Sequence, residues 1–388
     1  MDGSEMTAGQ RLAELIAAVP LVDHHVHGAL RASPTRAGFE SMLNEGLPGE
    51  PAASMTPFDS QLGFAIRRHC GPLLGVAPSA PAQEYWQARA SLTEAEVNRR
   101  LLPAAGVSDW LVDTGYGGDT VLSAGGLAGS GGGRGHEIVR LEALAETLAP
   151  SLSGGRDYAD AFRSRLASAF AAGGAVGAKS VIAYRTGFDI EWRRPSDGEV
   201  GLAADRWLSE LASTGANVRL KDETLLRFGV YAALDAGRPL QLHVGFGDRD
   251  LDLRLVNPLY LRGFLFDAEA AGVPVMLLHC YPYEREAGYL AQSFRCVYID
   301  VGLAVNYVGA RSVSVIANSL ELAPFGRILY SSDAWGPAEL HYLGAKLWRR
   351  GMTRVLGAWV DEGEWSAADA GRVVEAIAHR NAQRVYGL

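Results

Sequence analysis

Histidines in this 388-residue chain gather at the ends of short apolar runs. Four of the nine histidines, His25, His27, His243 and His279, stand at such positions. His25 and His27 are two residues apart in PLVDHHVH, so in a strand their side chains would share one face. Neutral imidazole is the commonest histidine form that binds metals, and a pair with this spacing can hold one ion. The pair alone is a weak indication, and the other two histidines strengthen it.

Two further polar residues stand in comparable places. Asp333 follows the run ILYSS, and Lys179 lies inside VGAKSVIAY. A lysine within an apolar strand is costly unless it is neutralised or paired. Carboxylation of the amine would turn Lys179 into a carboxylate that can bridge two metal ions, whereas an ordinary ion-paired lysine is the alternative interpretation.

The apolar runs alternate with helical stretches, and this alternation predicts a parallel sheet. Eight units of this kind fit a closed (β/α)8 TIM barrel better than an open sheet, and no GxGxxG motif opens a helix. The expected strands are Pro20–His27, Val107–Val112, Glu137–Leu141, Val176–Ala183, Pro239–Val244, Pro274–His279, Cys296–Val301 and Arg327–Ser332. The clearest expected helices are Ala203–Thr214, Lys221–Ala236, Leu259–Ala271 and Arg311–Leu322.

Three segments extend this minimal barrel, which we expect to form one domain over residues 1–388. The segment Gly28–Gly106 is an insertion, helical over Gln61–Cys70 and Gln83–Leu102, and Gly115–Gly135 reads as a mobile glycine-rich loop. Both segments follow a strand, so both should lie at the mouth of the barrel. The sequence is equally compatible with a lid over the site and with surface loops that have no role in it. The stretch Trp365–Tyr386 is predicted to be helical and to close the barrel from outside.

Composition limits the classes of partner. The net charge of −8 disfavours nucleic acid, and no apolar run reaches the ~18 residues of a membrane span. The three cysteines are widely spaced without a CxxC pair, and the N-terminus lacks the features of a signal peptide. We therefore expect a cytoplasmic protein with a small-molecule substrate. The oligomeric state is left open, and a homo-oligomer is compatible with the sequence.

The order of these polar residues resembles the metal-ligand order of the amidohydrolase superfamily: HxH after strand one, Lys after four, His after five and six, Asp after eight. VDHHVH resembles the family's opening D-x-H-x-H, and GAKS, LHVGFGD, LLHCYP and SSDAW resemble its later blocks. AKSVIAYRTGF resembles the second amidohydrolase group, some members of which are fused to glutamine-synthetase-like domains. The resemblance spans about Leu21 to Trp335.

The resemblance implies a metal-dependent hydrolase that cleaves an amide C–N bond with a hydroxide bridging two divalent ions. His25, His27 and Asp333 would hold one ion, His243 and His279 the other, and carboxylated Lys179 would bridge them. Asp333 would also move the proton. Zinc is expected first, and manganese, iron or nickel would accept the same ligands.

Loops after the fourth and sixth expected strands offer groups for a substrate. An arginine fork matches a carboxylate, and tyrosine adds a hydroxyl, so we expect a small anionic substrate, an N-acyl or γ-glutamyl amino-acid derivative. The expected substrate-binding residues are Tyr184, Arg185, Tyr281, Tyr283 and Arg285.

Other interpretations stay open. A mononuclear metal-dependent decarboxylase or other lyase, a lactonase or esterase, and a metal-free binding protein could all use this barrel. Strand alternation also predicts that Asp23 shares the face of His25 and His27, either to hold an imidazole or in a structural role, and that His24 faces away.

Overall fold

Seven parallel strands, hydrogen-bonded in sequence order, form the centre of the molecule. The computed structural model describes residues 6–46, 55–171, 173–214 and 219–388. The strands are β1 (Leu21–Val26), β2 (Val107–Asp113), β3 (Arg134–Arg140), β4 (Ala175–Ser180), β5 (Leu240–His243), β6 (Val275–Leu278) and β7 (Val297–Ile299). Each of them overlaps an expected strand, so the predicted α/β architecture is confirmed.

The eighth expected run, Arg327–Ser332, closes the ring between β7 and β1 without forming a regular strand. A parallel bridge joins Ile328 to Ile299, and the Leu329 amide donates to the Ile299 carbonyl at 2.9 Å. On the other side the His24 amide donates to the Tyr330 carbonyl at 3.2 Å. Regular pairing ends at Ser332, because the amide of this residue donates to the side-chain carboxylate of Asp23 and not to a carbonyl of a neighbouring strand. The chain therefore forms an eight-membered barrel with one irregular member.

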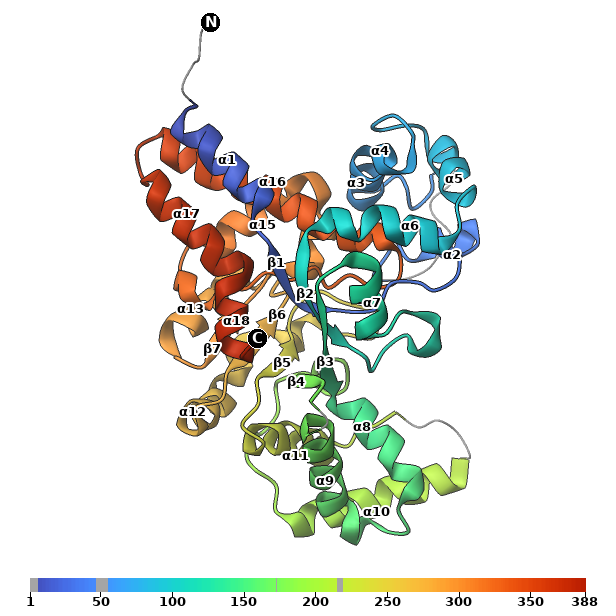
Figure 1. Cartoon of the computed structure of the whole chain (residues 1–388). Coiled ribbons are helices and arrows are strands. Elements are labelled where there is room, and N and C mark those ends of the chain that lie inside the picture. Colours follow the sequence, from blue (N-terminus) through green and yellow to red (C-terminus); the bar gives the residue numbers. More distant parts are fainter. Residues whose placement is uncertain (1–5, 47–54, 172, 215–218) are drawn as a thin grey trace, which may run out of the picture.

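Helices surround this barrel on its outside (Figure 1). Within the described ranges, none of them combines the length and the apolar character that crossing a membrane requires. The helices are α1 (Ala8–Ala18), α2 (Arg36–Ser41), α3 (Gln61–His69), α4 (Gly71–Leu74), α5 (Ala82–Ala90), α6 (Glu94–Leu101), α7 (Ala124–Gly131), α8 (Leu141–Leu148), α9 (Tyr158–Ala171), α10 (Asp197–Thr214), α11 (Glu223–Asp235), α12 (Arg262–Ala271), α13 (Glu284–Ser293), α14 (Gly302–Tyr307), α15 (Ser312–Ser319), α16 (Ala338–Asp361), α17 (Ala367–Glu375) and α18 (Asn381–Tyr386).

The long insertion after β1 folds into helices α2 to α6, which lie together beside α16 in Figure 1. The expected helix Gln83–Leu102 is two helices, because Thr93 caps a new start with a capping box. The segment Gly115–Gly135, which we expected to be a loop, contains the helix α7 instead. Ser123 caps this helix, and the helix packs on β2 and β3. Tertiary packing overrides the low helix propensity of its glycines.

The floor of the barrel is apolar and closed by the C-terminus. Side chains from β1, β2, β3, β6 and the eighth run meet inside the ring, and the buried Tyr386 of α18 packs against them. The region predicted to be helical from Trp365 to Tyr386 contains α17, a π-helical turn over Ala376–Arg380, and α18. The polar residues of the strands consequently meet at the opposite end, the mouth.

Candidate metal and substrate site

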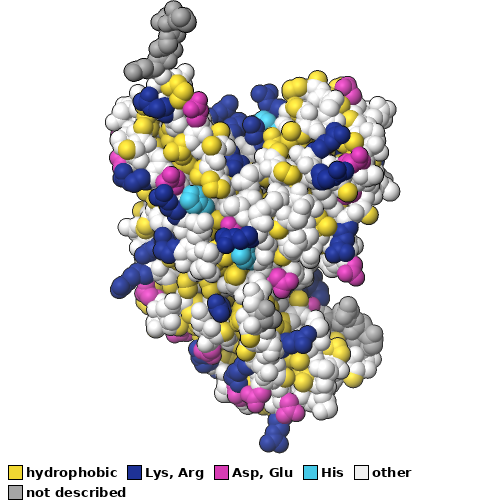
Figure 2. All heavy atoms as spheres, viewed as in Figure 1, with side chains coloured by type: hydrophobic (Ala, Val, Ile, Leu, Met, Phe, Trp, Pro, Cys, Tyr) yellow, Lys and Arg dark blue, Asp and Glu magenta, His cyan; other side chains and the backbone are white. Residues whose placement is uncertain are grey.

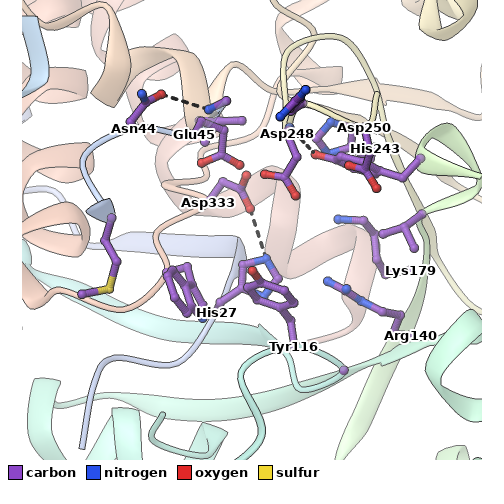
Figure 3. Close-up of a pocket in the computed structure, with 18 of the residues that line it drawn as sticks. His27, Asn44, Glu45, Tyr116, Arg140, Lys179, His243, Asp248, Asp250 and Asp333 are labelled. Atoms are coloured by element: carbon purple, nitrogen blue, oxygen red, sulfur yellow. Dashed lines mark hydrogen bonds and ion pairs between the residues drawn. The ribbon is translucent and has the colours of Figure 1, made fainter. Parts of the chain in front are cut away.

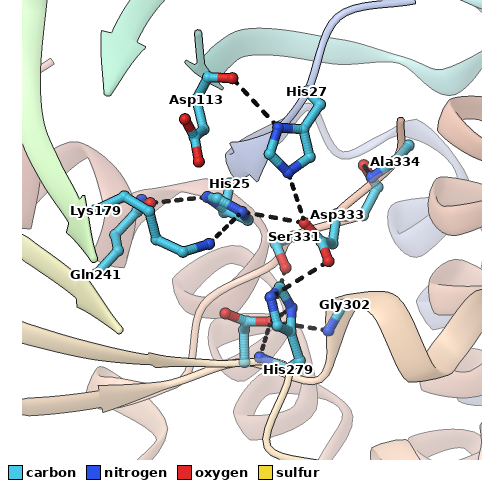
Figure 4. Close-up of polar contacts among 12 residues, drawn as sticks. His25, His27, Asp113, Lys179, Gln241, His279, Gly302, Ser331, Asp333 and Ala334 are labelled. Atoms are coloured by element: carbon cyan, nitrogen blue, oxygen red, sulfur yellow. Dashed lines mark hydrogen bonds and ion pairs between the residues drawn. The ribbon is translucent and has the colours of Figure 1, made fainter. Parts of the chain in front are cut away.

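His25 and His27 leave β1 with their rings turned in the same direction, toward Asp333 (Figure 4). The Nδ1 atom of His25 lies 2.8 Å from Oε1 of Gln241, and Nδ1 of His27 lies 3.2 Å from the Asp113 carbonyl. Both neighbours are acceptors, so each Nδ1 carries the proton and each Nε2 presents its lone pair. The two Nε2 atoms lie 3.1 and 3.5 Å from Oδ1 of Asp333.

The neighbours of these histidines differ from strict alternation, because the pairing of β1 with β2 shifts register between Asp23 and Val26. His24, expected to face away, instead reaches Oδ2 of Asp300 at 3.0 Å and the Tyr386 hydroxyl at 3.2 Å. Asp23 does not hold an imidazole and accepts hydrogen bonds from Ser332. Of the two roles considered for Asp23, holding an imidazole or a structural role, the structure therefore supports the structural one.

His279 and His243 complete the ring of imidazoles. Nε2 of His279 lies 3.3 Å from Oδ2 of Asp333, so this carboxylate contacts three histidines. The rings of His243 and His279 are 4.7 Å apart between centroids. His279 and Asp333 both have positive φ, +69° and +48°, a backbone strain that non-glycine residues adopt mostly at functional sites.

Lys179 is buried at the end of β4 beside the first pair, with Nζ 3.1 Å from Nε2 of His25 (Figure 4). Burial lowers the pKa of Lys179 to about 8, against the attraction of Asp113 and Asp333. A substantial fraction of the amine is therefore neutral near pH 8, and the neutral amine is the form that can react with carbon dioxide.

The charge states suit a cation at this point. Burial lowers the pKa of His25 to about 3, helped by Lys179, and it lowers the pKa values of His243 and His279 as well. These imidazoles are therefore neutral near pH 7. Burial raises the pKa of Asp333, but the imidazoles of His279, His25 and His27 outweigh it and keep the group a carboxylate.

Several of these atoms lack a hydrogen-bond partner among the described residues. They are Nε2 of His243, Nε2 of His279 and Oδ1 of Asp333, all buried. Buried polar atoms without partners are costly, and a divalent cation would engage them. Ligand atoms of His25, His27 and Asp333 also lie within 4.8 Å of one another, close enough to share one ion. The residues present therefore fit a metal centre.

A cavity of about 980 Å³ opens over this cluster (Figure 3). His27, Lys179, His243 and Asp333 form part of its wall. Glu45 and Asp248 stand across from Asp333, while Arg140 and Tyr116 line another side in the figure. The volume suits a small molecule of the size that enzyme clefts commonly enclose.

Two arginines of this cavity differ in their pairing. Arg140 is paired with Asp113: its Nη2 and Nε donate to Oδ2 at 2.6 and 3.0 Å, and Nε also donates to Oδ1 at 3.2 Å. Arg185 makes one long contact, 3.3 Å from Nη2 to Oε1 of Glu146, although its side chain is only 6% exposed. Its Nε and Nη1 atoms have no partner among the described residues. Of these two arginines, Arg185 is the one with donors available for a ligand.

The other expected substrate residues divide into two groups. Tyr184 lines the cavity and lies with its ring centroid 4.6 Å from that of His243. Tyr281, Tyr283 and Arg285 are outside the cavity wall: the Tyr283 hydroxyl donates to the Leu253 carbonyl, and the exposed Arg285 pairs with Glu321. The helix α13, which begins at Glu284, carries Arg285 away from the mouth.

Some residues of the site carry no sequence signal. Gln241 precedes His243 of β5 by two residues and is indistinguishable in the sequence from an ordinary strand residue. Glu45 and Tyr307 come from distant segments and meet at 2.9 Å between Oε2 and the hydroxyl. Tyr116 and Trp335 pack together, with ring centroids 5.3 Å apart, beside His27. The hints that further groups would reach the mouth were the two segments that follow strands, Gly28–Gly106 with Glu45 and Gly115–Gly135 with Tyr116.

Comparison with known proteins places this site in a family. The model of a family described as amidohydrolase matches residues 158–388. Protein fluG from Emericella nidulans is 32% identical over 278 residues, which is 65% of this chain. The chain spans about a third, 32%, of the length of that relative.

Solved structures agree with the fold. A proposed metal-dependent hydrolase from Lactobacillus casei ATCC 334 is 28% identical, with a TM-score of 0.84 over 97% of both chains. A uronate isomerase from Bacillus halodurans C-125 is 14% identical, with a TM-score of 0.61 over 99% of this chain and 98% of its own. The second similarity concerns the fold alone.

Proposed function

Because this chain belongs to the amidohydrolase family, we propose that it hydrolyses an amide C–N bond of a small carboxylated substrate at the mouth of its barrel. The observation that carries the proposal is the arrangement of imidazoles. In His25 and His27 each Nδ1 atom faces an acceptor, which turns Nε2 toward Asp333. His279 approaches the same carboxylate, and this donor set is typical of a catalytic metal centre.

The ligands divide between two divalent ions in this proposal. His25, His27 and Asp333 would hold one ion, His243 and His279 would hold the other, and Lys179, once carboxylated, would supply a further carboxylate ligand. Zinc is the first choice for this mixture of nitrogen and oxygen ligands. When bound, such ions polarise a substrate carbonyl and acidify water.

The protein's own groups then handle protons and orientation. Asp333, held as a carboxylate by three imidazoles, takes a proton from the attacking water at Oδ1 or Oδ2 and passes it to the leaving nitrogen. Arg185 offers its two unpartnered N–H groups to a substrate carboxylate, and Tyr184 supplies a hydroxyl nearby. An N-acyl or γ-glutamyl amino acid carries both groups that these residues recognise.

One observation favours an alternative. Among the described residues, the cluster within ion-sharing distance contains only His25, His27 and Asp333, and Nζ of Lys179 lies 3.1 Å from Nε2 of His25. A single ion with a nearby ammonium would suit a decarboxylase or another lyase. Metal content distinguishes the two: near two ions per chain supports the hydrolase with a bridging Lys179, and near one supports the alternative.

A substrate screen tests the reaction itself. The purified, metal-loaded protein should hydrolyse members of a panel of N-acyl and γ-glutamyl amino acids in preference to neutral esters and lactones. Arg185→Met should lower kcat/KM roughly ten- to a hundredfold on the best substrate, the effect of losing a hydrogen bond to a charged group.

Arg285→Met is the matched control, because it removes the same side chain from an exposed ion pair with Glu321. That variant should keep kcat/KM within about twofold, since exposed ion pairs contribute little. A screen that yields only neutral substrates, or an Arg185→Met variant that behaves like Arg285→Met, would contradict the proposed substrate class.

A further inference from the structure

A second cavity, of about 410 Å³, lies at the other end of the barrel from the mouth. Its wall includes Ala18 of α1 and Gly106, which come just before β1 and β2 in the chain. The amino ends of those strands therefore form its floor. The remaining wall is α16, which contributes Tyr342, Thr353 and four cationic residues: Lys346, Arg349, Arg350 and Arg354.

The spacing of these cations places them on one side of α16. Lys346, Arg350 and Arg354 are separated by four residues each, so they follow one another along a single helix face. From the first to the last they span about 12 Å along the helix axis. Figure 2 shows Lys and Arg side chains gathered in the notch at the top of the molecule. One side of this notch is formed by α1 and α16, and the other by the helices of the insertion.

Acidic residues do not neutralise this cluster in the part of the chain that the structure describes. None of the four cations belongs to an ion pair there, whereas half of the other arginines, 15 of 30, do. Burial and the charges of Arg354 and Arg68 lower the pKa of Arg350. Burial, with Lys346, Arg68 and Arg350, also lowers the pKa of His69 to about 4, so His69 is neutral near pH 7 and the positive charge that α3 adds beside Arg350 is that of Arg68.

One of the four cations is held rigidly. Nη1 of Arg349 donates to the Ala105 carbonyl at 2.7 Å, and Nη2 donates to the Val19 carbonyl at 3.0 Å. These carbonyls position the guanidinium without cancelling its charge. Its Nε atom is buried without a partner among the described residues. A guanidinium that is held in place and has an unpartnered N–H group is well suited to bind an anion.

We propose that this cavity binds a small molecule carrying two or more linked phosphate groups. The four cations that line this one cavity repel one another, and a bound anion offsets that repulsion. One tetrahedral anion can reach only part of a row about 12 Å long, whereas linked phosphates can follow it. The enclosed volume suits a small ligand such as a nucleoside triphosphate or inorganic polyphosphate, and the acidic remainder of the surface disfavours a nucleic-acid polymer.

Titration calorimetry of the full, metal-loaded chain with inorganic tripolyphosphate tests this proposal. The double variant Lys346→Glu/Arg354→Glu should weaken binding at least about tenfold, because two exposed charges that face the ligand are reversed. Binding by the unaltered protein should also weaken as ionic strength rises. ATP in place of tripolyphosphate would show whether the site accepts a nucleotide or only the phosphate chain.

The control variant Lys221→Glu/Arg165→Glu reverses the same number of charges on another part of the surface, and it should bind tripolyphosphate like the unaltered protein. Equal weakening in both variants would mean a general charge effect, and equal, undiminished binding would mean that tripolyphosphate binds elsewhere, for example at the metal centre. The proposal would be overturned by either of these results. It would also be overturned if the unaltered protein did not bind tripolyphosphate, or if it bound orthophosphate with equal affinity. Circular dichroism of the variants checks that each folds.

Discussion

Asp333 is the residue on which the proposed chemistry depends most. Its two carboxylate oxygens face the Nε2 atoms of His25, His27 and His279 at 3.1 to 3.5 Å. A carboxylate in that position can share a metal ion and still exchange a proton with a neighbouring water. Its positive φ of +48° keeps the carboxylate turned into the ring of imidazoles.

Replacing Asp333 with Asn separates these two roles. The amide keeps the shape and one oxygen ligand but cannot accept a proton, so kcat should fall by roughly 10²- to 10⁴-fold, the usual contribution of a general base. Metal content measured on the same preparation should stay above half of the unaltered value. Turnover that survives in a metal-loaded Asp333→Asn protein would assign the proton to another group, such as the carboxyl of Glu45 or Asp248, which line the same cavity.

Sequence reasoning at this scale found ligand types at strand ends, because the mouth of a barrel collects whatever follows its strands. It predicted that His25, His27 and Asp333 share one metal ion; the structure brings these side chains together, and their role as ligands stays a prediction. It missed Gln241, since a glutamine that holds an imidazole looks like any inward strand residue. It misjudged His24 because the register shift in β1 breaks the two-residue alternation on which the prediction rested.

At the scale of elements, the insertion is fixed to α16 by a buried ion-pair network. Arg89 of α5 donates from Nε to Oε1 of Glu339 at 2.7 Å and pairs with Glu94 at 2.9 Å. The Tyr85 hydroxyl also donates to Glu339. Glu339 lies in the first turn of α16, where a carboxylate interacts favourably with the helix dipole. It is six residues after Asp333 in the chain. The insertion therefore holds the start of the helix that follows the site.

Arg89→Met should destabilise the protein by about 3–5 kcal/mol, because it leaves two buried carboxylates without their cation. Urea unfolding followed by circular dichroism measures the change. Arg36→Met, which removes an arginine from the partly exposed pair with Glu40, is the control and should cost less than about 1 kcal/mol. Similar losses in the two variants would show that the buried network does not anchor the insertion.

Elements were predicted best where packing and local pattern agree. The apolar runs of β1, β5 and β6 stand out because these strands are buried on both faces, whereas β3 is mostly polar and largely exposed or half-buried. The glycine-rich stretch was misread, since α7 owes its helix to the Ser123 cap and to packing on β2 and β3. The eighth run reads as a strand, but Ser332 bonds to the Asp23 side chain in place of a ladder partner.

At the scale of the whole molecule, the proposed centre ties together segments far apart in the chain. His25 and His27 come from β1, His243 ends β5, and His279 and Asp333 follow β6 and the eighth run. Metal binding would therefore cross-link the barrel at its mouth, where irregular backbone replaces the hydrogen bonds of the strands. The floor, closed by Tyr386 and its apolar neighbours, would be stable without it.

Removing metal should consequently lower the melting temperature. A ligand that binds only the folded state stabilises it by about 2.7 kcal/mol at a hundred times its dissociation constant, which corresponds to a shift of a few degrees for a chain of this size. Thermal unfolding before chelation, after it, and after metal is restored measures the shift. In His279→Ala the three curves should coincide, because a ligand is missing. In His379→Ala, which alters a histidine of the C-terminal π-helical turn, the shift should persist. If chelation removed the metal from the unaltered protein without moving its melting temperature, the ions would not connect the strand ends, and the mouth would have to be held by its side-chain network alone.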